Sequence, residues 1–170
     1  LIMAFELEDQ IMPVARELAV IPLSQNALVN ASPLTQTFPL FRDKSGVYHF
    51  PDTISVFGEF GFAMNVVDKR EGTNNVYQFH RAELMVDGNL EFELSYDRIP
   101  FNQGKFAKTM IEYDLKRKNL GEFQKLYRLP EHRKISIHSS DKSGILGLAP
   151  GVHSIEIRIF DAHGNQTIIK

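Results

Sequence analysis

The segment from Gly151 to Lys170 constrains the fold more than any other part of the sequence. In its first half apolar and polar residues alternate, so Ile155, Ile157 and Ile159 fall on one face of an extended chain. Turn-forming residues come next, and a run of β-branched residues then leads to the C-terminal lysine. This order predicts a closing β-hairpin with one face in a core and the other in solvent.

Extended segments separated by turn residues recur along the rest of the chain. We expect strands within residues 14–23, 38–50, 53–68 and 82–96, and a short strand at Ile135 and Ile137. In the first strand, Leu18 and Val20 fall on one face, and Ala19 and Ile21 fall on the other. In the third, Gly58 and Gly61 predict a bulge or a close backbone approach.

The tetrapeptide DKSG occurs twice, at residues 43–46 and 141–144, and each copy precedes a β-branched residue. The first copy is predicted to be the turn of a hairpin within residues 38–50. Similarity between the two regions does not spread beyond these four residues, so we interpret them as repeated turn chemistry and not as a duplicated domain.

The hairpin within residues 82–96 depends on the length of its loop. A two-residue Asp-Gly turn would place Leu84 opposite Glu91 and mix carboxylates into the apolar face. A three-residue loop places Leu84 opposite Phe92 and keeps that face apolar. We therefore predict the longer loop, with Asn89 in the left-handed conformation that such a loop requires.

Together these segments predict roughly eight or nine short strands with turns between them, which is typical of an antiparallel β-sandwich. Good helix formers predict one short helix around residues 112–120. The closing segment resembles the last strands of immunoglobulin-like sandwiches in bacterial envelope proteins. The predicted fold class is therefore an all-β, antiparallel, immunoglobulin-like sandwich that occupies residues 14–170 as a single domain. Residues 1–13 are expected to be a lead-in from a preceding domain.

Size and charge limit the classes of partner. A chain of 170 residues buries enough surface for one proper core. Its formal net charge of -2 gives no electrostatic argument for a nucleic-acid partner. No run approaches the ~20 apolar residues of a membrane span, and the first residues do not have the pattern of a signal peptide. The sequence contains 0 Cys, so no thiolate metal site is expected.

No residue pattern predicts catalysis, a metal site or a cofactor. The 6 His include neither an HExxH pair nor two His with one residue between them. The GxSxG pattern of a serine nucleophile is absent. Glu91 and Glu93 are two residues apart on a predicted strand, which is typical of a solvated face. Asp161 and Asn165 offer too few oxygens for calcium and instead predict a turn.

Ligand binding is the function class for which the sequence offers candidate side chains. Basic and aromatic residues interleave from residue 116 to 128, where Tyr127 and Arg128 could contact a glycan or an anionic polymer. Tyr96 is a further candidate for an aromatic platform. The default interpretation is a solvated strand whose Lys and Arg stems cover apolar neighbours. The count of 0 Trp argues against a carbohydrate platform without excluding one built on tyrosine.

Four phrases of the sequence carry a resemblance to one protein family. In chain order they are EDQIMPVARELAVIPL, FRDKSGVYHFPDTISVFGEFGFAMNVVD, FQKLYRLPEH and LAPGVHSIEIRIFDAHGN. They are similar to the region that follows the catalytic domain in lysostaphin-like (LytM-type) zinc metallopeptidases of bacterial envelopes. The specificity lies in their order and coverage, since no single phrase is diagnostic. Residues 1–9 would fit the seam after such a catalytic domain.

The resemblance implies a periplasmic or cell-envelope β-sandwich attached to a peptidase that cleaves peptidoglycan or acts in cell division. The zinc ligands of that family lie in a His-to-Asp motif and a His-x-His motif, and no position here matches either. The expected function is therefore a non-catalytic accessory domain that positions or restrains a neighbouring catalytic module or an envelope partner. The alternatives are a glycan- or peptidoglycan-binding module and, third, a stand-alone hydrolase.

Overall fold

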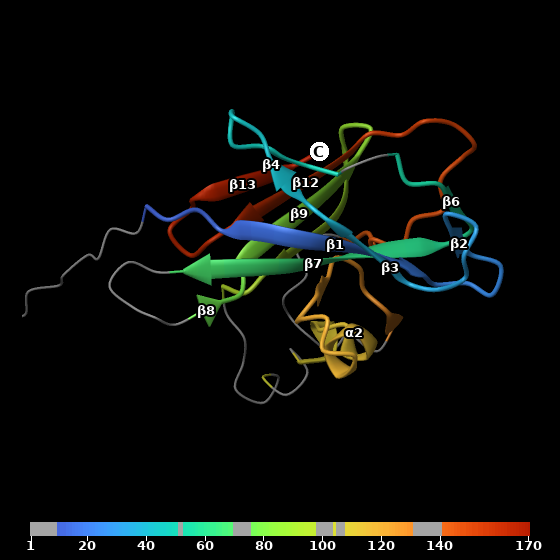
Figure 1. Cartoon of the computed structure of the whole chain (residues 1–170), viewed down its shortest axis with the longest axis horizontal. Helices are drawn as coiled ribbons and strands as arrows, with labels where there is room; N and C mark the ends of the chain where they lie inside the picture. Colours follow the sequence, from blue (N-terminus) through green and yellow to red (C-terminus); the bar gives the residue numbers. More distant parts are fainter. Residues whose placement is uncertain (1–9, 51–52, 70–75, 98–103, 105–107, 131–140) are drawn as a thin grey trace, which may run out of the picture.

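The computed structural model describes residues 10–50, 53–69, 76–97, 104, 108–130 and 141–170 (Figure 1). Strands make up 45% of the structure and helices 8%, which confirms the all-β class. The predicted short helix is confirmed as α2 (Tyr113–Arg117), which follows a 3-10 turn at Lys108–Met110. The predicted strand at Ile135 and Ile137 lies outside the described residues, as do residues 1–9 of the predicted lead-in.

The described residues contain thirteen strands, more than the predicted eight or nine, because six of them have only two residues. The seven longer strands are β1 (Val14–Pro22), β3 (Gln36–Pro39), β7 (Phe60–Lys69), β9 (Arg81–Val86), β10 (Asn89–Ser95), β12 (Ile155–Phe160) and β13 (Gln166–Ile169). The two-residue strands are β2 (Leu28–Val29), β4 (Phe41–Arg42), β5 (Tyr48–His49), β6 (Val56–Phe57), β8 (Val76–Tyr77) and β11 (Gln124–Lys125).

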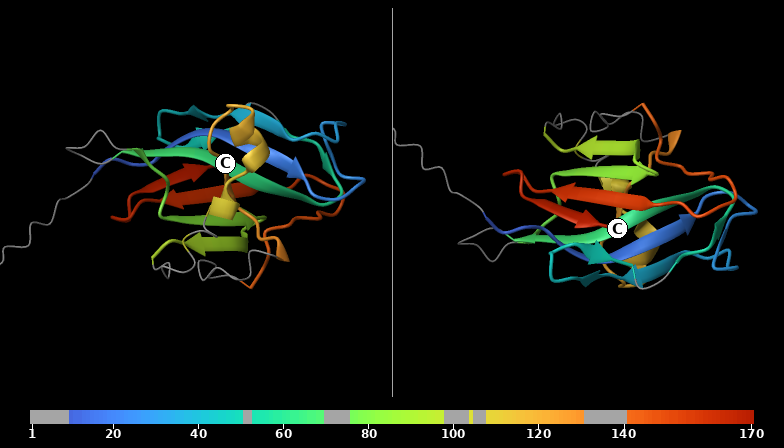
Figure 2. Two further views of the ribbon diagram at one scale, coloured as in Figure 1. Left: turned by 90° about the horizontal axis from the view of Figure 1, so that it is seen from below. Right: turned by 90° about the horizontal axis from the view of Figure 1, so that it is seen from above.

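The strands form two main sheets that lie as two layers (Figure 2). The five-stranded sheet has the order β11-β7-β1-β3, with β8 also paired to β7. The six-stranded sheet has the order β10-β9-β12-β13-β5-β4, and β2 and β6 form a separate pair. The pairings are antiparallel except that β13 runs parallel to β5, where Ile169 pairs with Tyr48. The expectation of a purely antiparallel sandwich is wrong at this point, and neither sheet closes into a barrel.

The main core lies between the two sheets. Leu18 and Val20 of β1 face Leu84 of β9 and Ile157 of β12 across it, and all four are fully buried. Burying such aliphatic side chains stabilises a fold by about 1.5–3 kcal/mol each. The alternating patterns of the first strand and of the closing hairpin therefore predicted the correct inward faces.

A second, smaller core covers the other face of the five-stranded sheet. Ala19 and Ile21 of β1 pack there against Leu115 of α2 and the ring of Tyr127. A Cβ on Gly61 would lie 2.5 Å from that ring, so only glycine leaves the ring enough space. The predicted close approach at Gly61 is confirmed, although a side-chain ring and not the backbone makes it.

The β9–β10 hairpin corrects the predicted loop length. Asp87 and Gly88 form a two-residue turn with φ values of 49 and 78, the geometry of a type I′ turn. Asn89 is part of β10, so its predicted left-handed conformation is wrong. A register shift between Leu90 and Phe92 then inserts one extra residue in β10.

That bulge reconciles the short turn with the apolar face. Leu84 pairs with Phe92, as predicted, because the extra residue cancels the offset that the two-residue turn introduces. The prediction that Leu84 lies opposite Phe92 on an apolar face was thus correct. The predicted three-residue loop was wrong, because a two-residue turn and a bulge produce the same pairing.

The segment predicted as a hairpin within residues 38–50 divides between the two sheets. Gln36–Pro39 pairs with β1, whereas Phe41–Arg42 pairs with β5 in the other sheet. The DKSG turn joins β4 to β5 as predicted, with Asp43 Oδ1 accepting hydrogen bonds from the Ser45 and Val47 amides at 2.8 and 3.0 Å. The chain crosses between layers at Leu40, a step that alternation of side chains does not reveal.

Candidate functional site

Tyr127, the first of the predicted ligand-binding residues, lies in the second core with 1% of its surface exposed. Its hydroxyl donates a hydrogen bond to Glu112 Oε2 at 3.1 Å. A sugar ring can stack only on an exposed aromatic face, and the ring of Tyr127 offers none. The aromatic residues Phe123 and Tyr127 of the interleaved segment are core residues on either side of β11, which pairs with β7.

The other two candidate residues are each engaged in contacts of their own. Tyr96 is half-buried against the main core and accepts a hydrogen bond from the Gln124 side chain, and burial raises its pKa to about 12. Arg128 donates to the carbonyl of Asp141 at 3.0 Å, which ties it to the second DKSG segment. The structure therefore does not assemble the three residues into one surface, and ligand binding by them stays a prediction.

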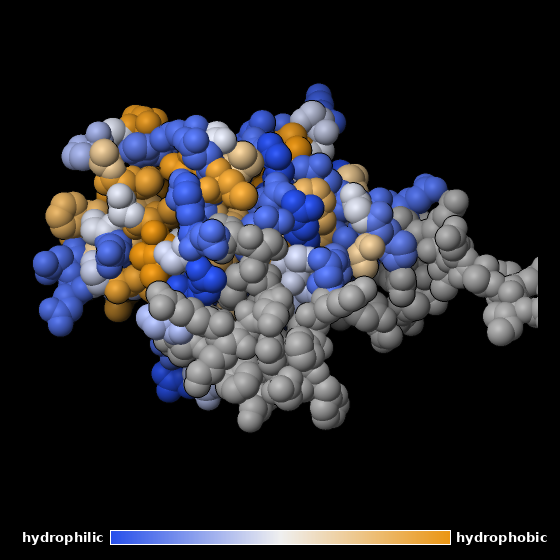
Figure 3. All heavy atoms as spheres, turned by 180° about the vertical axis from the view of Figure 1, so that it is seen from behind, coloured by the Kyte–Doolittle hydropathy of each residue, from blue (hydrophilic) through white to orange (hydrophobic). Residues whose placement is uncertain are grey.

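A groove lies at the end of the sandwich that carries β6. Its volume is about 1490 Å³, and one wall is formed by residues 53–60 and the other by residues 147–156. Phe60 and Phe62 lie at its base, and Ile54, Val56 and Leu148 add to its apolar lining. Apolar residues gather at this end on the back face of the molecule (Figure 3).

Two apolar side chains at the groove are largely exposed. Phe57 of β6 is 65% exposed and Val152 of the opposite wall is 94% exposed. Contiguous apolar surface beside a concave site is a common mark of an interaction surface in soluble proteins. The groove, with Phe57 and Val152 at its walls, is therefore the candidate functional site.

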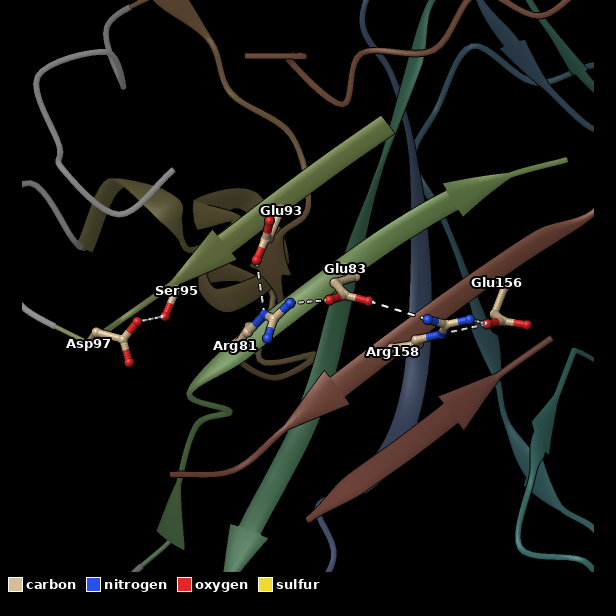
Figure 4. A network of polar contacts seen from close by, with 7 residues as sticks. All are labelled: Arg81, Glu83, Glu93, Ser95, Asp97, Glu156 and Arg158. Carbon is tan, nitrogen blue, oxygen red and sulfur yellow. Dashed lines mark hydrogen bonds and ion pairs between the residues drawn. The ribbon is translucent and has the colours of Figure 1, made fainter. Parts of the chain in front are cut away.

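An ion-pair network crosses strands β10, β9 and β12 of the six-stranded sheet (Figure 4). Its members alternate in charge across β10, β9 and β12 and reach the C-terminal residue: Glu93, Arg81, Glu83, Arg158, Glu156 and Lys170. The last three also border the groove. The groove thus has an apolar interior and, on this side, a rim of charges that are already paired.

Arg81 has a specific role in this network. Glu83 and Glu93 are direct partners across the β9–β10 pairing, which would place two negative charges side by side. Arg81 contacts both carboxylates, with its Nε 2.9 Å from Glu93 Oε1, and its guanidinium lies 5.0 Å from the centre of the Phe160 ring. Glu93, one of the two alternating acids predicted to lie on a solvated face, is instead only 18% exposed and is neutralised by Arg81 of the neighbouring strand, while Glu91 pairs with Lys142.

We expect the Arg81→Leu substitution to lower the free energy of unfolding by about 2 kcal/mol, because it takes this partner from Glu93 and leaves the adjacent Glu83 with the longer contact to Arg158 at 3.6 Å. The side chains of these acids are only 13% and 18% exposed, so water screens them poorly. The matched control is Arg117→Leu, which removes an exposed pair with Asp114 and should cost less than about 0.5 kcal/mol. Urea unfolding of both variants measures the difference, and equal costs would contradict this role of Arg81.

Three histidines each contact an aspartate at a turn or strand end. The pairs are His49 with Asp43 at 2.8 Å, His80 with Asp97 at 2.6 Å and His153 with Asp87 at 2.6 Å. In each case a serine hydroxyl also donates to the carboxylate, namely that of Ser45, Ser95 and Ser154. Nucleophilic catalysis requires the hydroxyl to contact the imidazole, and these hydroxyls contact the acid instead. The clusters act as turn supports.

The carboxylates of these clusters hold their charge. The Ser45 hydroxyl and His49 keep the pKa of Asp43 well below its ordinary value of 3.8. The Ser95 hydroxyl lowers the pKa of Asp97 in the same way. Only the pair of His49 with Asp43 could be anticipated from sequence, because His49 follows the DKSG turn closely, whereas the other two pairs join residues far apart in the chain.

Asp161 and Asn165, which were considered as calcium ligands, were predicted to form a turn instead. Asp161 Oδ1 accepts hydrogen bonds from the His163 and Asn165 amides, both at 2.8 Å, which confirms the predicted turn. Over the described ranges, no group of three or more His, Cys, Asp or Glu side chains is arranged to hold a metal ion. No helix within the same ranges is long and apolar enough to cross a membrane.

A scan against protein-family models and searches of curated proteins and of solved structures found no match to this chain.

Proposed function

We propose that this chain is a non-catalytic accessory domain with an immunoglobulin-like topology, and that its groove binds apolar side chains of a neighbouring peptidase module in the same parent protein. The observation that carries the proposal is the apolar groove with Phe57 and Val152 exposed at its walls. An apolar centre with a polar rim is the usual composition of a protein–protein interface.

The charges around the groove support a binding function over a chemical one. Glu156 is paired with Arg158 and Lys170, and His153 is paired with Asp87, so these groups are engaged with one another. Paired charges at a rim orient a partner and exclude wrong partners, whereas a catalytic site holds groups poised to react with substrate. Together they frame the apolar surface of the groove.

The parent protein and compartment of the proposal come from the sequence. The four ordered phrases resemble the region after the catalytic domain of lysostaphin-like peptidases. This resemblance supports a location in the periplasm or cell envelope and a peptidase module as the partner. It also supports the assignment of all peptide-bond chemistry to that module.

A peptidoglycan-binding module is the second candidate, and one observation favours it. Phe57 offers an exposed aromatic ring at the wall of a groove of about 1490 Å³. Sugar rings stack on such faces, although binding sites for sugars also need convergent polar groups. A test of the proposed function must therefore separate the two candidates.

We expect the isolated chain to leave purified muropeptides intact when zinc is added, and to stay in the supernatant when mixed with purified peptidoglycan sacculi. Hydrolysis is followed by chromatography of the muropeptides and binding by co-sedimentation. Turnover with stoichiometric bound zinc would overturn the non-catalytic assignment. Co-sedimentation that is lost in a Phe57→Ala variant would favour the glycan-binding candidate instead.

A further inference from the structure

One wall of the groove is tied to the β9–β10 turn by a single cluster of contacts. His153 Nδ1 lies 2.6 Å from Asp87 Oδ2, and the Ser154 amide donates to Asp87 Oδ1 at 2.8 Å. In the opposite sense, the Asp87 amide donates to the Ser154 carbonyl at 2.9 Å. The wall formed by residues 147–156 is thus anchored where it enters β12.

The imidazole of His153 has an acceptor at each ring nitrogen. Besides the Asp87 carboxylate at Nδ1, the carbonyl oxygen of Ala149 lies 2.8 Å from Nε2. A neutral imidazole carries one N–H and can donate to only one of these acceptors, whereas the imidazolium donates to both. The protonated ring therefore closes residues 149–153 into a short loop and joins that loop to the turn.

We propose that His153 is a pH-dependent latch, which holds the groove wall against the β9–β10 turn when protonated and releases its contact with Ala149 when neutral. This proposal is based on the geometry of the loop, and it does not depend on which partner occupies the groove. It adds to the proposed binding function a means by which acidity fixes the shape of the binding surface.

The electrostatics of the cluster agree with this geometry. The Asp87 carboxylate, and after it the Ala149 carbonyl, raise the pKa of His153 above its ordinary value of 6.5. His153 in turn lowers the pKa of Asp87 below its ordinary value of 3.8, with help from the Ser154 amide. The other charged groups that border the groove are Glu59, Glu156, Arg158 and Lys170.

These directions set the pH range of the latch. The His153 contribution is fully present below pH 6.5, the ordinary pKa, and is lost as the pH rises through the higher pKa of the folded protein. The Asp87 contribution is present above pH 3.8 and is lost as the pH falls through the lower pKa of the folded protein. The latch is therefore fully closed between pH 3.8 and pH 6.5, the two ordinary pKa values, and it opens on the alkaline side as the pH rises through the pKa of His153 in the folded protein.

Two measurements on the full chain test the latch. In an NMR titration, the imidazole of His153 should titrate with a midpoint above 6.5, its ordinary value. In hydrogen exchange corrected for the intrinsic effect of pH, the protection of the Ser154 amide should fall roughly fivefold from pH 6 to pH 9. This amide donates to Asp87 Oδ1, and loss of the His153–Ala149 hydrogen bond loosens the loop that ends at Ser154.

The matched variants are His153→Gln and His49→Gln, each of which removes a histidine that contacts an aspartate. The protection of Ser154 should become independent of pH in H153Q and keep its pH dependence in H49Q, whose turn lies outside the groove. A titration midpoint at or below 6.5 in the wild type would overturn the proposal. So would protection that does not change with pH, or that changes equally in H153Q.

Discussion

Replacing Gly144 by alanine is expected to lower the free energy of unfolding by about 3 kcal/mol or more, whereas Gly46→Ala should cost only about 1 kcal/mol. Both glycines end a DKSG tetrapeptide and both have a positive φ, 71 at Gly144 and 90 at Gly46. The cost of an alanine in this left-handed conformation is therefore shared by the two variants. Their surroundings make the difference.

A Cβ on Gly144 would lie 2.4 Å from the Leu126 carbonyl oxygen and 2.9 Å from the Phe92 side chain. Leu126 is held by the bond from its amide to the Phe62 carbonyl at 2.8 Å, and Phe92 is fully buried, so neither can move cheaply. At Gly46 the nearest atom is Arg42 Nη2 at 3.0 Å, the end of a flexible side chain. Overpacking of a core costs about 1–3 kcal/mol, and relaxation of a surface side chain costs little.

Urea unfolding of both variants measures this prediction directly. Because the two substitutions share the same local sequence and backbone region, the difference between them isolates the contacts of Gly144. Equal destabilisation would show that residues 141–144 do not pack against Phe92 and Leu126 as described. A larger loss at Gly46 would contradict the packing of both turns.

The repeated tetrapeptide also shows where interpretation of the sequence was reliable. Both copies bring a glycine with positive φ, so the prediction of shared turn chemistry was right for the backbone of that residue. The first copy joins β4 to β5, while Ser143 in the second accepts a hydrogen bond from the Arg128 amide at 2.6 Å. Local sequence set the local conformation, and the rest of the fold decided what each copy packs against.

Apolar periodicity predicted the elements that border the main core. Leu18 and Val20, and also Ile157 and Ile159, are buried on the faces that the alternation assigned to them. The pattern was less informative where the chain changes sheets, as at Leu40, or where a bulge inserts a residue, as between Leu90 and Phe92. Alternation records which face of a strand is buried and carries no information on which strand lies beside it.

The candidate site could not be predicted from the sequence, because its walls are loops about 90 residues apart and loops have no period. Tyr127 was singled out by its neighbours in sequence, and the fold places it in the core instead. Phe57 lies near the start of the strand predicted within residues 53–68, just before the bulge or close approach expected at Gly58, and only the tertiary structure leaves it exposed. The four sequence phrases gave the family hypothesis, but they do not identify the surface that would contact a peptidase.

The second large effect concerns that surface. We expect Phe57→Ser to weaken binding to the proposed peptidase partner at least tenfold, since burying a phenylalanine contributes about 1.5–3 kcal/mol and such side chains dominate interfaces. Phe57 is 65% exposed, so its loss should leave the fold itself nearly unchanged. Leu34→Ser is the matched control, because Leu34 is 70% exposed and does not line the groove.

The central claim is that the groove is a binding surface for a catalytic module encoded in the same parent protein. It is tested most directly by calorimetric titration of that module into the wild-type chain, the F57S variant and the L34S variant. We predict stoichiometric binding to the wild type, at least tenfold weaker binding to F57S, and binding to L34S within about twofold of the wild type. The claim is contradicted if the wild type does not bind, or if the two variants lose affinity equally.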